Sequence, residues 1–172
     1  MDGEQLKRAF GELFRDEVIN HGDYSLVYGQ APSSGAALLI GYRRTPLELM
    51  FCPVEVCPPS PARGAMTEGM VRRAGPITSV SLTDVATVAD TGRWYRVESV
   101  TGRRIVFEVP ETLHFPAASS GGYPGDGAVV LVQGQDAEDF HQFMSDFMDT
   151  LDGFYAVPDV IEFPGPTLLA SA

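Results

Sequence analysis

Apolar side chains recur at helical spacing near both ends of the chain, and this pattern predicts two amphipathic helices. The apolar face near the N-terminus comprises Leu6, Ala9, Phe10, Leu13 and Phe14. The apolar face near the C-terminus comprises Phe140, Phe143, Met144, Phe147, Met148 and Leu151. We expect Asp2 to cap the first helix, with Gln5 completing a capping box. We expect Asp136 to cap the second helix and Gly153 to end it.

Between the two helices, apolar and polar positions alternate as they do in half-buried strands. Strands are predicted over residues 24–28, 36–42, 47–51, 76–82, 85–89 and 129–133, with a hairpin over 93–110. Segments 52–75 and 110–127 are rich in proline and glycine and are predicted to be long loops. The first of these loops is expected to hold a short strand near 54–56 or 70–72.

The apolar positions of the hairpin determine its register. Tyr95 and Val97 share a face with Ile105 and Phe107 only if Tyr95 lies opposite Phe107 and Val97 lies opposite Ile105. This register leaves a three-residue loop, 100–102, whose last residue is a glycine. We therefore expect that glycine to adopt the left-handed backbone conformation such loops require.

The order of elements predicts an α+β fold in which one domain spans residues 1–172. We expect a partly open antiparallel β-barrel or meander of about seven strands, capped by the C-terminal amphipathic helix. The N-terminal helix, 1–22, is an addition to this core, which spans 24–151. A tail over 153–172 is apolar and contains prolines, and we expect its first part to pack on the body or on a neighbouring subunit.

Strand patterns at 76–82, 94–99 and 103–109, followed by a helix at 137–151, resemble the pleckstrin-homology-like (PH-like, or GRAM-type) superfold, particularly its small bacterial members. The resemblance covers about residues 24–151 and implies a non-catalytic binding or scaffold module. Members that bind phosphoinositides carry a basic cluster in the loop after the first strand. The corresponding segment here, 29–35, has no Lys or Arg, so we expect no phosphoinositide membrane binding.

The charge of the chain is unevenly distributed. The sequence has 23 acidic and 12 basic residues, a formal charge of −11, and the segment 111–172 contains ten carboxylates and no Lys or Arg. Such a field repels nucleic acid and anionic membranes, so neither is an expected partner. The acidic segment is either a solvated surface or a surface that docks on arginine-bearing strands or on a basic partner.

Composition places the chain among folded proteins of the cytoplasm. Hydrophobic residues make up 44% and charged residues 20%, and the sequence shows no secretory signal or membrane-spanning run. Eleven of the twelve basic residues are Arg, and with abundant Ala, Gly and Pro this suggests a GC-rich bacterial genome.

Candidate catalytic and metal-binding groups are sparse. His21, His114 and His141 are scattered along the sequence, and none is spaced with Cys52 or Cys57 as zinc ligands are. We expect both cysteines to be free structural thiols, no metal or cofactor, and no enzymatic activity. His141 should face solvent or an acidic neighbour beside the phenylalanine stripe.

Glu98 and Glu108 fall on one expected face of the hairpin, and paired carboxylates can perform acid–base chemistry. The register, however, places Glu98 opposite Arg104, and Arg96 is also close. A structural lattice of charges is therefore the expected arrangement.

The sequence leads to three hypotheses about function. The first is a non-enzymatic protein-binding or scaffold PH-like domain that binds another protein or self-associates. The second is a binder of small apolar ligands in a helix-capped β-cup. The third is an acidic secretion or assembly chaperone that acts as a dimer. The candidate interaction surface comprises Leu6, Phe10, Leu13, Phe14, Phe154, Tyr155, Val160, Ile161 and Phe163.

Overall fold

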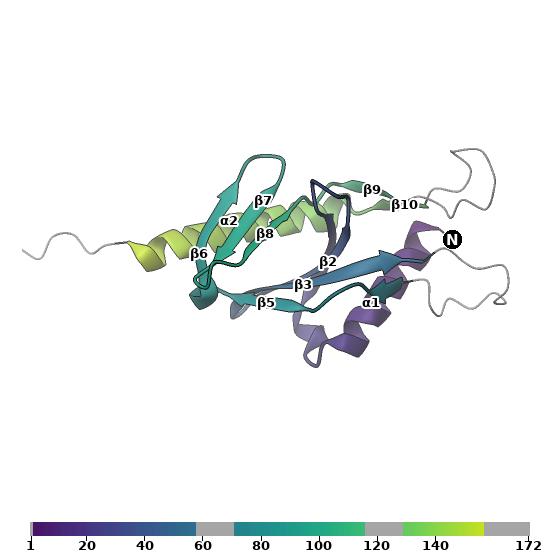
Figure 1. Ribbon diagram of the computed structural model, residues 1–172, viewed down its shortest axis with the longest axis horizontal. Coiled ribbons are helices and arrows are strands. Elements are labelled where there is room, and N and C mark those ends of the chain that lie inside the picture. Colours follow the sequence, from purple (N-terminus) through teal and green to yellow (C-terminus); the bar gives the residue numbers. More distant parts are fainter. Residues whose placement is uncertain (1, 58–70, 116–128, 157–172) are drawn as a thin grey trace, which may run out of the picture.

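The computed structural model describes residues 2–57, 71–115 and 129–156, and it shows an α+β fold. The described part holds ten strands in three antiparallel sheets and two α-helices, α1 (Gly3–Glu17) and α2 (Gly134–Tyr155). Two short 3-10 helices are also present: η1 (His21–Asp23) lies between α1 and the first strand, and η2 (Leu82–Asp84) connects two strands. Figure 1 shows α2 running along the long axis of the molecule, with α1 at the end opposite to the last turn of α2.

The largest sheet has five strands. They are β1 (Ser25–Gln30), β2 (Ala37–Arg44), β3 (Leu47–Val56), β4 (Val71–Arg73) and β5 (Thr78–Ser81). β1, β2 and β3 form a meander, and the long β3 then pairs with β4 near its end and with β5 near its start. One strand thus holds two short neighbours on the same edge.

The other two sheets are smaller. The three-stranded sheet comprises β6 (Val85–Asp90), β7 (Tyr95–Ser99) and β8 (Arg104–Phe107), and the two-stranded sheet comprises β9 (Thr112–Phe115) and β10 (Val129–Val132). A single β-bridge between Gln30 and Glu108 connects the end of β1 to the chain just after β8. The described strands do not form a closed barrel.

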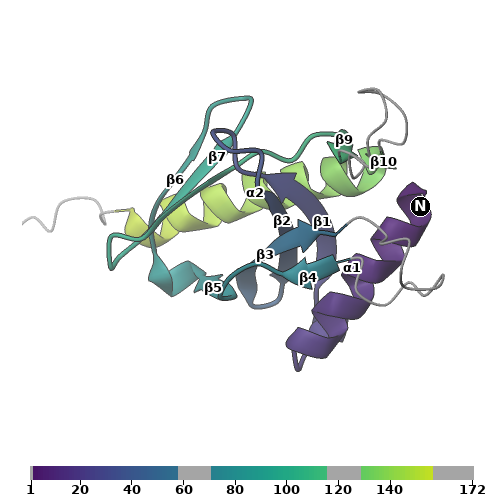
Figure 2. The ribbon, with the colours of Figure 1, turned by 45° about the vertical axis from the view of Figure 1, so that its right-hand side comes forward.

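The five-stranded sheet separates two hydrophobic cores. On one face Val27, Ile40 and Phe51 pack with the apolar stripe of α2 and with Tyr95 and Phe107 of the three-stranded sheet. On the other face Tyr28, Leu39 and Cys52, each one residue along from its counterpart, pack with α1 and with the β9–β10 pair. This alternation is what the two-residue repeat of a strand produces. Figure 2 shows β1, β2 and β3 of this sheet between the purple α1 and the yellow-green α2.

Several sequence-based predictions are confirmed. Asp2 and Gln5 form the expected capping box of α1. The hairpin has the predicted register, with Tyr95 opposite Phe107 and Glu98 opposite Arg104. Gly102 has a φ of 81°, so it occupies the left-handed conformation expected of the last loop residue. The apolar stripe of the C-terminal helix faces the core, where Phe140, Phe143, Met144, Phe147 and Leu151 are buried.

Other predictions were wrong. The segment after the hairpin was expected to be a loop, but Thr112–Phe115 is a strand that pairs with β10. Leu113 and Phe115 are buried there between polar neighbours, a pattern too short to stand out in the sequence. Gln133, not Asp136, is the N-cap residue of α2. Gly153 does not end α2, because the helix continues to Tyr155.

Two glycines allow α1 to lie close to the strands. A Cβ atom on Gly41 of β2 would lie 2.7 Å from Cζ of Phe14, and a Cβ atom on Gly3 would lie 2.4 Å from the carbonyl oxygen of Val130. Real Cβ atoms do not approach other atoms so closely, so larger side chains at these positions would force the helix away. α1 is therefore an integral part of the domain.

Candidate functional site

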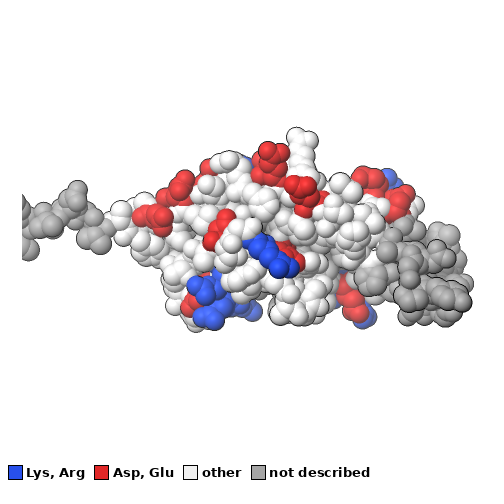
Figure 3. Space-filling model, turned by 90° about the horizontal axis from the view of Figure 1, so that it is seen from above, with Lys and Arg blue, Asp and Glu red and all other residues white. Residues whose placement is uncertain are grey.

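The outward face of α2 carries a dense row of carboxylates. Its exposed acidic residues are Asp136, Glu138, Asp139, Asp146, Asp149 and Asp152, and the helix contains no Lys or Arg. We call these six residues the α2 carboxylate row. In the view of Figure 3, most acidic side chains lie toward the upper long edge of the molecule, and most of the basic surface lies in the middle and toward the lower edge.

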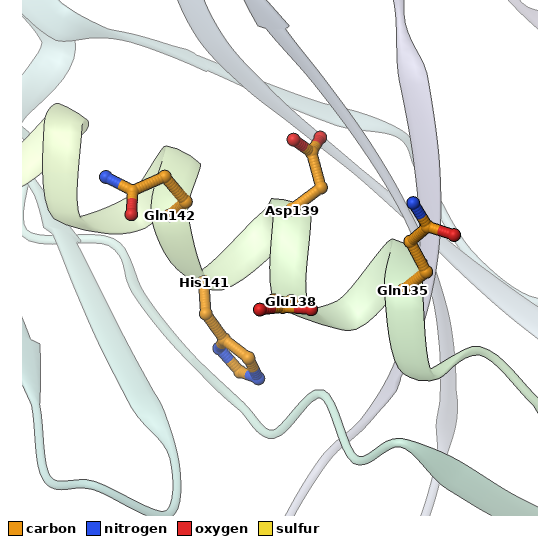
Figure 4. Close-up of a pocket in the computed structure, with 5 residues that line it drawn as sticks. All are labelled: Gln135, Glu138, Asp139, His141 and Gln142. Carbon is orange, nitrogen blue, oxygen red and sulfur yellow. The ribbon is translucent and has the colours of Figure 1, made fainter.

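A surface hollow lies over the first half of α2. It has a volume of about 560 Å³ and is lined by Gln135, Glu138, Asp139, His141 and Gln142. These side chains project from successive turns of the helix in Figure 4, with Asp139 and His141 pointing to opposite sides. A second hollow of about 260 Å³ shares His141 and is otherwise lined by residues of the β6–β7 turn region.

Asp139 is fixed in place by the five-stranded sheet. The Tyr42 hydroxyl donates a hydrogen bond of 2.6 Å to Oδ2 of Asp139, and Nη2 of Arg44 lies 3.1 Å from Oδ1. Burial, followed by this hydrogen bond, raises the pKa of Tyr42 well above its ordinary value of 10. The phenol therefore remains a donor at neutral pH and holds the carboxylate in one orientation.

His141 is fixed by the three-stranded sheet on the other side of α2. The Tyr95 hydroxyl lies 2.7 Å from Nδ1 of His141, and the two rings are 5.8 Å apart. Burial, followed by the nearby carboxylate of Asp90, raises the pKa of Tyr95 to about 12. One tyrosine from each sheet thus orients one polar side chain of the hollow.

Most of the α2 carboxylate row lacks a counter-charge within the described part of the chain. Asp136 lies 3.7 Å from the amine of Lys7, and Asp139 pairs with Arg44. Glu138, Asp146, Asp149 and Asp152 form no ion pair with any described residue, and Asp146 accepts a hydrogen bond from Gln142. Asp149 and Asp152 also lie in the last two turns of α2, where the negative end of the helix dipole disfavours anions. These carboxylates therefore do not stabilise the helix.

The inward face of α2 fills the space between the sheets. The rings of Phe107 and Phe140 are 6.1 Å apart, and those of Phe143 and Phe147 are 5.8 Å apart. Both hollows described above lie at the surface rather than behind this aromatic layer.

Other polar groups considered from the sequence have structural partners. Glu98 lies 3.2 Å from Nε of Arg104, as predicted, while Glu108 accepts a hydrogen bond from Gln30 and lies 3.7 Å from Nε of Arg93. The two glutamates therefore do not form a shared acid–base site.

The histidines and cysteines of the described segments are not gathered into one site. His21 lies in η1 with its Nδ1 3.3 Å from the Val18 carbonyl oxygen, and His114 is exposed on β9. Cys52 and Cys57 are free thiols, and burial raises the pKa of Cys52 to about 11. Across the described residues, no three His, Cys, Asp or Glu side chains are grouped so as to hold a metal ion.

The interaction surface expected from the sequence is divided by the structure. Leu6, Phe10 and Phe14 are buried in the core beneath α1, and Leu13 is half-buried against it, so these candidate residues pack within the chain instead of lining its surface. Their apolar spacing was visible in the sequence, but the sheet that covers them was not.

The described residues of the C-terminal part of that expected surface are exposed, unlike those of α1. Phe154 and Tyr155 are 59% and 51% exposed at the end of α2, and the Tyr155 hydroxyl donates to the Val85 carbonyl oxygen over 3.0 Å. Val160, Ile161 and Phe163 lie outside the described residues.

Sequence reasoning placed His141 and the acidic residues of α2 on the polar side of the helix, but it missed Tyr42, Arg44 and Tyr95. These three residues belong to strands distant in sequence from α2. The only available signal was the presence of a tyrosine at an inward strand position, which often carries its hydroxyl to a polar partner.

None of the described helices combines the length and apolar character needed to cross a membrane. Comparisons of the chain with protein-family models, with curated proteins and with solved structures find no match.

Proposed function

We propose that the chain is a non-enzymatic protein-binding or scaffold domain of PH-like type in the cytoplasm of a bacterium, and that the outward face of α2 docks a basic segment of a partner protein. The single observation that carries this proposal is the α2 carboxylate row, which has few counter-charges among the described residues and whose members Asp149 and Asp152 oppose the helix dipole.

The arrangement of strands supports the PH-like part of the proposal. Seven strands, β1, β2, β3, β5, β6, β7 and β8, surround the apolar face of α2, and β1 meets the chain after β8 through the Gln30–Glu108 bridge. A partly open barrel plugged by its last helix has this arrangement. The strands β4, β9 and β10 and the helix α1 are additions on the outer side.

Charge and shape favour a basic protein segment as the occupant. An arginine or lysine side chain entering the hollow would meet Glu138, which has no ion-pair partner among the described residues, and the side-chain oxygens of Gln135 and Gln142. Tyr42 and Tyr95 hold Asp139 and His141 in position before binding, so little side-chain entropy would be lost there. Carboxylates along the rest of α2 would attract the partner over a longer range.

Photo-crosslinking in cells of the source organism tests this proposal. A photoreactive amino acid replaces Gln142 in the hollow, and a matched variant carries it at Thr112, an exposed position on β9. We expect a protein adduct from position 142 and none from position 112, with the crosslinked peptide rich in Arg or Lys.

Two isosteric substitutions provide the control for charge. Glu138→Gln with Asp149→Asn removes two carboxylates without changing side-chain size, and we expect the adduct yield at position 142 to fall at least fivefold. An unchanged yield, or an acidic or neutral crosslinked peptide, would refute a basic partner. Native mass spectrometry that finds a bound lipid instead would favour the apolar-ligand hypothesis.

A further inference from the structure

Strand edges in this fold are protected to different degrees. The outer edge of β1 is covered, because the side chain of Gln133 hydrogen-bonds both the N–H and the C=O of Tyr28, and Gln30 pairs with Glu108. The short strands β4 and β5 have three and four residues. β6 has six residues and lies at the end of its sheet, where no other described strand pairs with its outer edge.

The hydrogen-bond pattern shows which groups of β6 point outward. The N–H of Thr91 donates to the carbonyl oxygen of Trp94 over 3.1 Å, so this opposed pair is hydrogen-bonded. Such pairs alternate along an antiparallel ladder, and Asp90 and Val88 consequently direct their N–H and C=O groups away from β7. These are the groups that an added strand would bind.

The side chains of β6 offer little resistance to an added strand. Natural edge strands are commonly protected by charged residues or proline. β6 has no proline, its only charged residue is Asp90 at its last position, and its one irregularity is a bulge between Val85 and Thr87. The Tyr155 hydroxyl donates a hydrogen bond to the Val85 carbonyl oxygen, so the outer edge of β6 is open only at residues 86–90.

This open part is complementary to itself. If two copies of β6 lie antiparallel with Val88 opposite Val88, then Thr87 lies opposite Ala89 and Ala86 lies opposite Asp90. No like charges face one another in this register. Val88 is half-buried against the core of its own domain, so the pairing would join the apolar faces of two three-stranded sheets.

We infer that β6 is the site at which a second copy of this chain adds, with a two-fold axis at Val88 that creates a continuous six-stranded sheet. An antiparallel pair of identical strands is isologous, which is the commonest symmetry of a homodimer. The inference does not depend on the proposed function of α2. The two surfaces also respond differently to salt, because salt weakens docking of a basic partner and strengthens pairing of two chains that each carry −11.

Sedimentation velocity of the full chain over a range of concentrations tests the inference. We expect a concentration-dependent dimer whose dissociation constant falls as NaCl is raised. Val88→Lys places two ammonium groups on the two-fold axis and should weaken the dimer at least tenfold. Val130→Lys, at an exposed strand position on β10, is the matched control and should leave the dissociation constant unchanged.

A third variant keeps the test decisive if Val88→Lys reduces folding. Ala86→Lys, at an exposed position, places an ammonium group of each copy opposite Asp90 of the other and should tighten the dimer about two- to thirtyfold, the effect of two symmetry-related cross-strand ion pairs. Lysine on an unprotected edge would otherwise weaken pairing, so the sign of the change tests the register. A monomer at every concentration, or a weaker dimer in Ala86→Lys, would overturn the inference.

Discussion

At the scale of single residues, the side chain of Gln133 forms the hydrogen bonds that a neighbouring strand would otherwise form with the edge of β1. Its buried side chain accepts a hydrogen bond from the Tyr28 N–H over 2.9 Å and donates to the Tyr28 and Pro110 carbonyl oxygens, each over 2.7 Å. Its backbone N–H donates to the Glu111 carbonyl oxygen. One side chain therefore closes the edge of β1 and joins it to the segment before β9.

We expect Gln133→Ala to lower the free energy of unfolding by about 1–3 kcal/mol, because the polar backbone groups of Tyr28 lose their partner where water is excluded. Urea titration at neutral pH measures the change. Gln135→Ala, two residues along and exposed, should change it by less than about 0.5 kcal/mol. Equal effects of the two substitutions would contradict this role for Gln133.

Glu48 is the centre of a polar cluster at the opposite end of the sheet. It accepts hydrogen bonds from Tyr24 and Ser79 and forms an ion pair with Arg43. Burial by itself would raise the pKa of Glu48, but the hydrogen bonds from Ser79 and Tyr24 and the charge of Arg43 outweigh it, and the pKa lies below its ordinary value of 4.5.

A depressed carboxyl pKa makes stability depend on pH. The contribution of Glu48 is present above pH 4.5 and is lost as the pH falls through the lower pKa of the folded state. Glu48→Gln should therefore destabilise the protein at neutral pH and reduce the loss of stability upon acidification. Unfolding free energies of both proteins between about pH 3 and about pH 6 check this, and parallel curves would contradict it.

At the scale of elements, the packing of α1 on the strands depends on Gly41. A methyl group there would lie 2.7 Å and 3.0 Å from two atoms of the Phe14 ring and 3.4 Å from the Tyr24 ring. We expect Gly41→Ala to cost about 1–3 kcal/mol, the usual penalty for overpacking a core.

Gly11 supplies a control on α1 itself. A Cβ atom there would have no neighbour within 4 Å, so Gly11→Ala should stabilise the protein by about 0.5–1 kcal/mol through helix propensity. Thermal denaturation of the two variants should show shifts of opposite sign. If the melting temperatures of both variants shifted in the same direction, α1 would not pack against β2 at Gly41.

α2 combines an apolar face that stabilises the fold with two carboxylates, Asp149 and Asp152, that oppose the helix dipole in its last two turns. Asp152→Lys reverses a charge near the negative end of the helix dipole, and we expect it to stabilise the protein by about 0.3–1 kcal/mol. The same substitution should reduce crosslinking of a partner at position 142. If the variant is stabilised but gives the same yield of crosslinked partner, the carboxylates of the last turn do not contribute to partner binding.

At the scale of the whole molecule, charge opposes compactness. With 23 acidic and 12 basic residues, the folded chain repels itself, and salt screens this repulsion. We expect the melting temperature to rise by about 2–4 °C between low and moderate ionic strength, which corresponds to ~1 kcal/mol for a domain of this size. A variant with Asp149→Asn and Asp152→Asn should show a smaller rise. A fall in melting temperature with salt would show that ion pairs dominate over net charge.

Much of the fold could be predicted from local patterns of apolar residues in the sequence. The register of the β7–β8 hairpin followed from four apolar side chains, and the buried face of α2 followed from its aromatic and methionine stripe. Both are short-range relations, in which residues close in sequence decide which side of an element is apolar. β9 was missed because its pairing with β10 joins segments separated by 116–128, and a four-residue strand carries too few positions to be recognised alone.

Of the candidate site, only the residues that belong to α2 could be predicted from the sequence. The carboxylates of α2 and the solvent-facing position of His141 follow from helical periodicity. The tyrosine anchors do not, because Tyr42 and Tyr95 come from two different sheets and meet α2 only when both sheets pack against it. Long-range contacts of this kind leave no periodic trace in the sequence.

The sequence by itself determined which faces of the helices and strands are apolar and that the C-terminal third is strongly acidic, because these properties belong to side chains and to local backbone geometry. Only the tertiary structure decided that the apolar face of α1 is covered by the chain's own strands, that β1 is closed by Gln133, and that β6 keeps an open edge. The physical reason is that burial and hydrogen-bond satisfaction depend on which segments meet in space, and that choice is made by packing the whole chain.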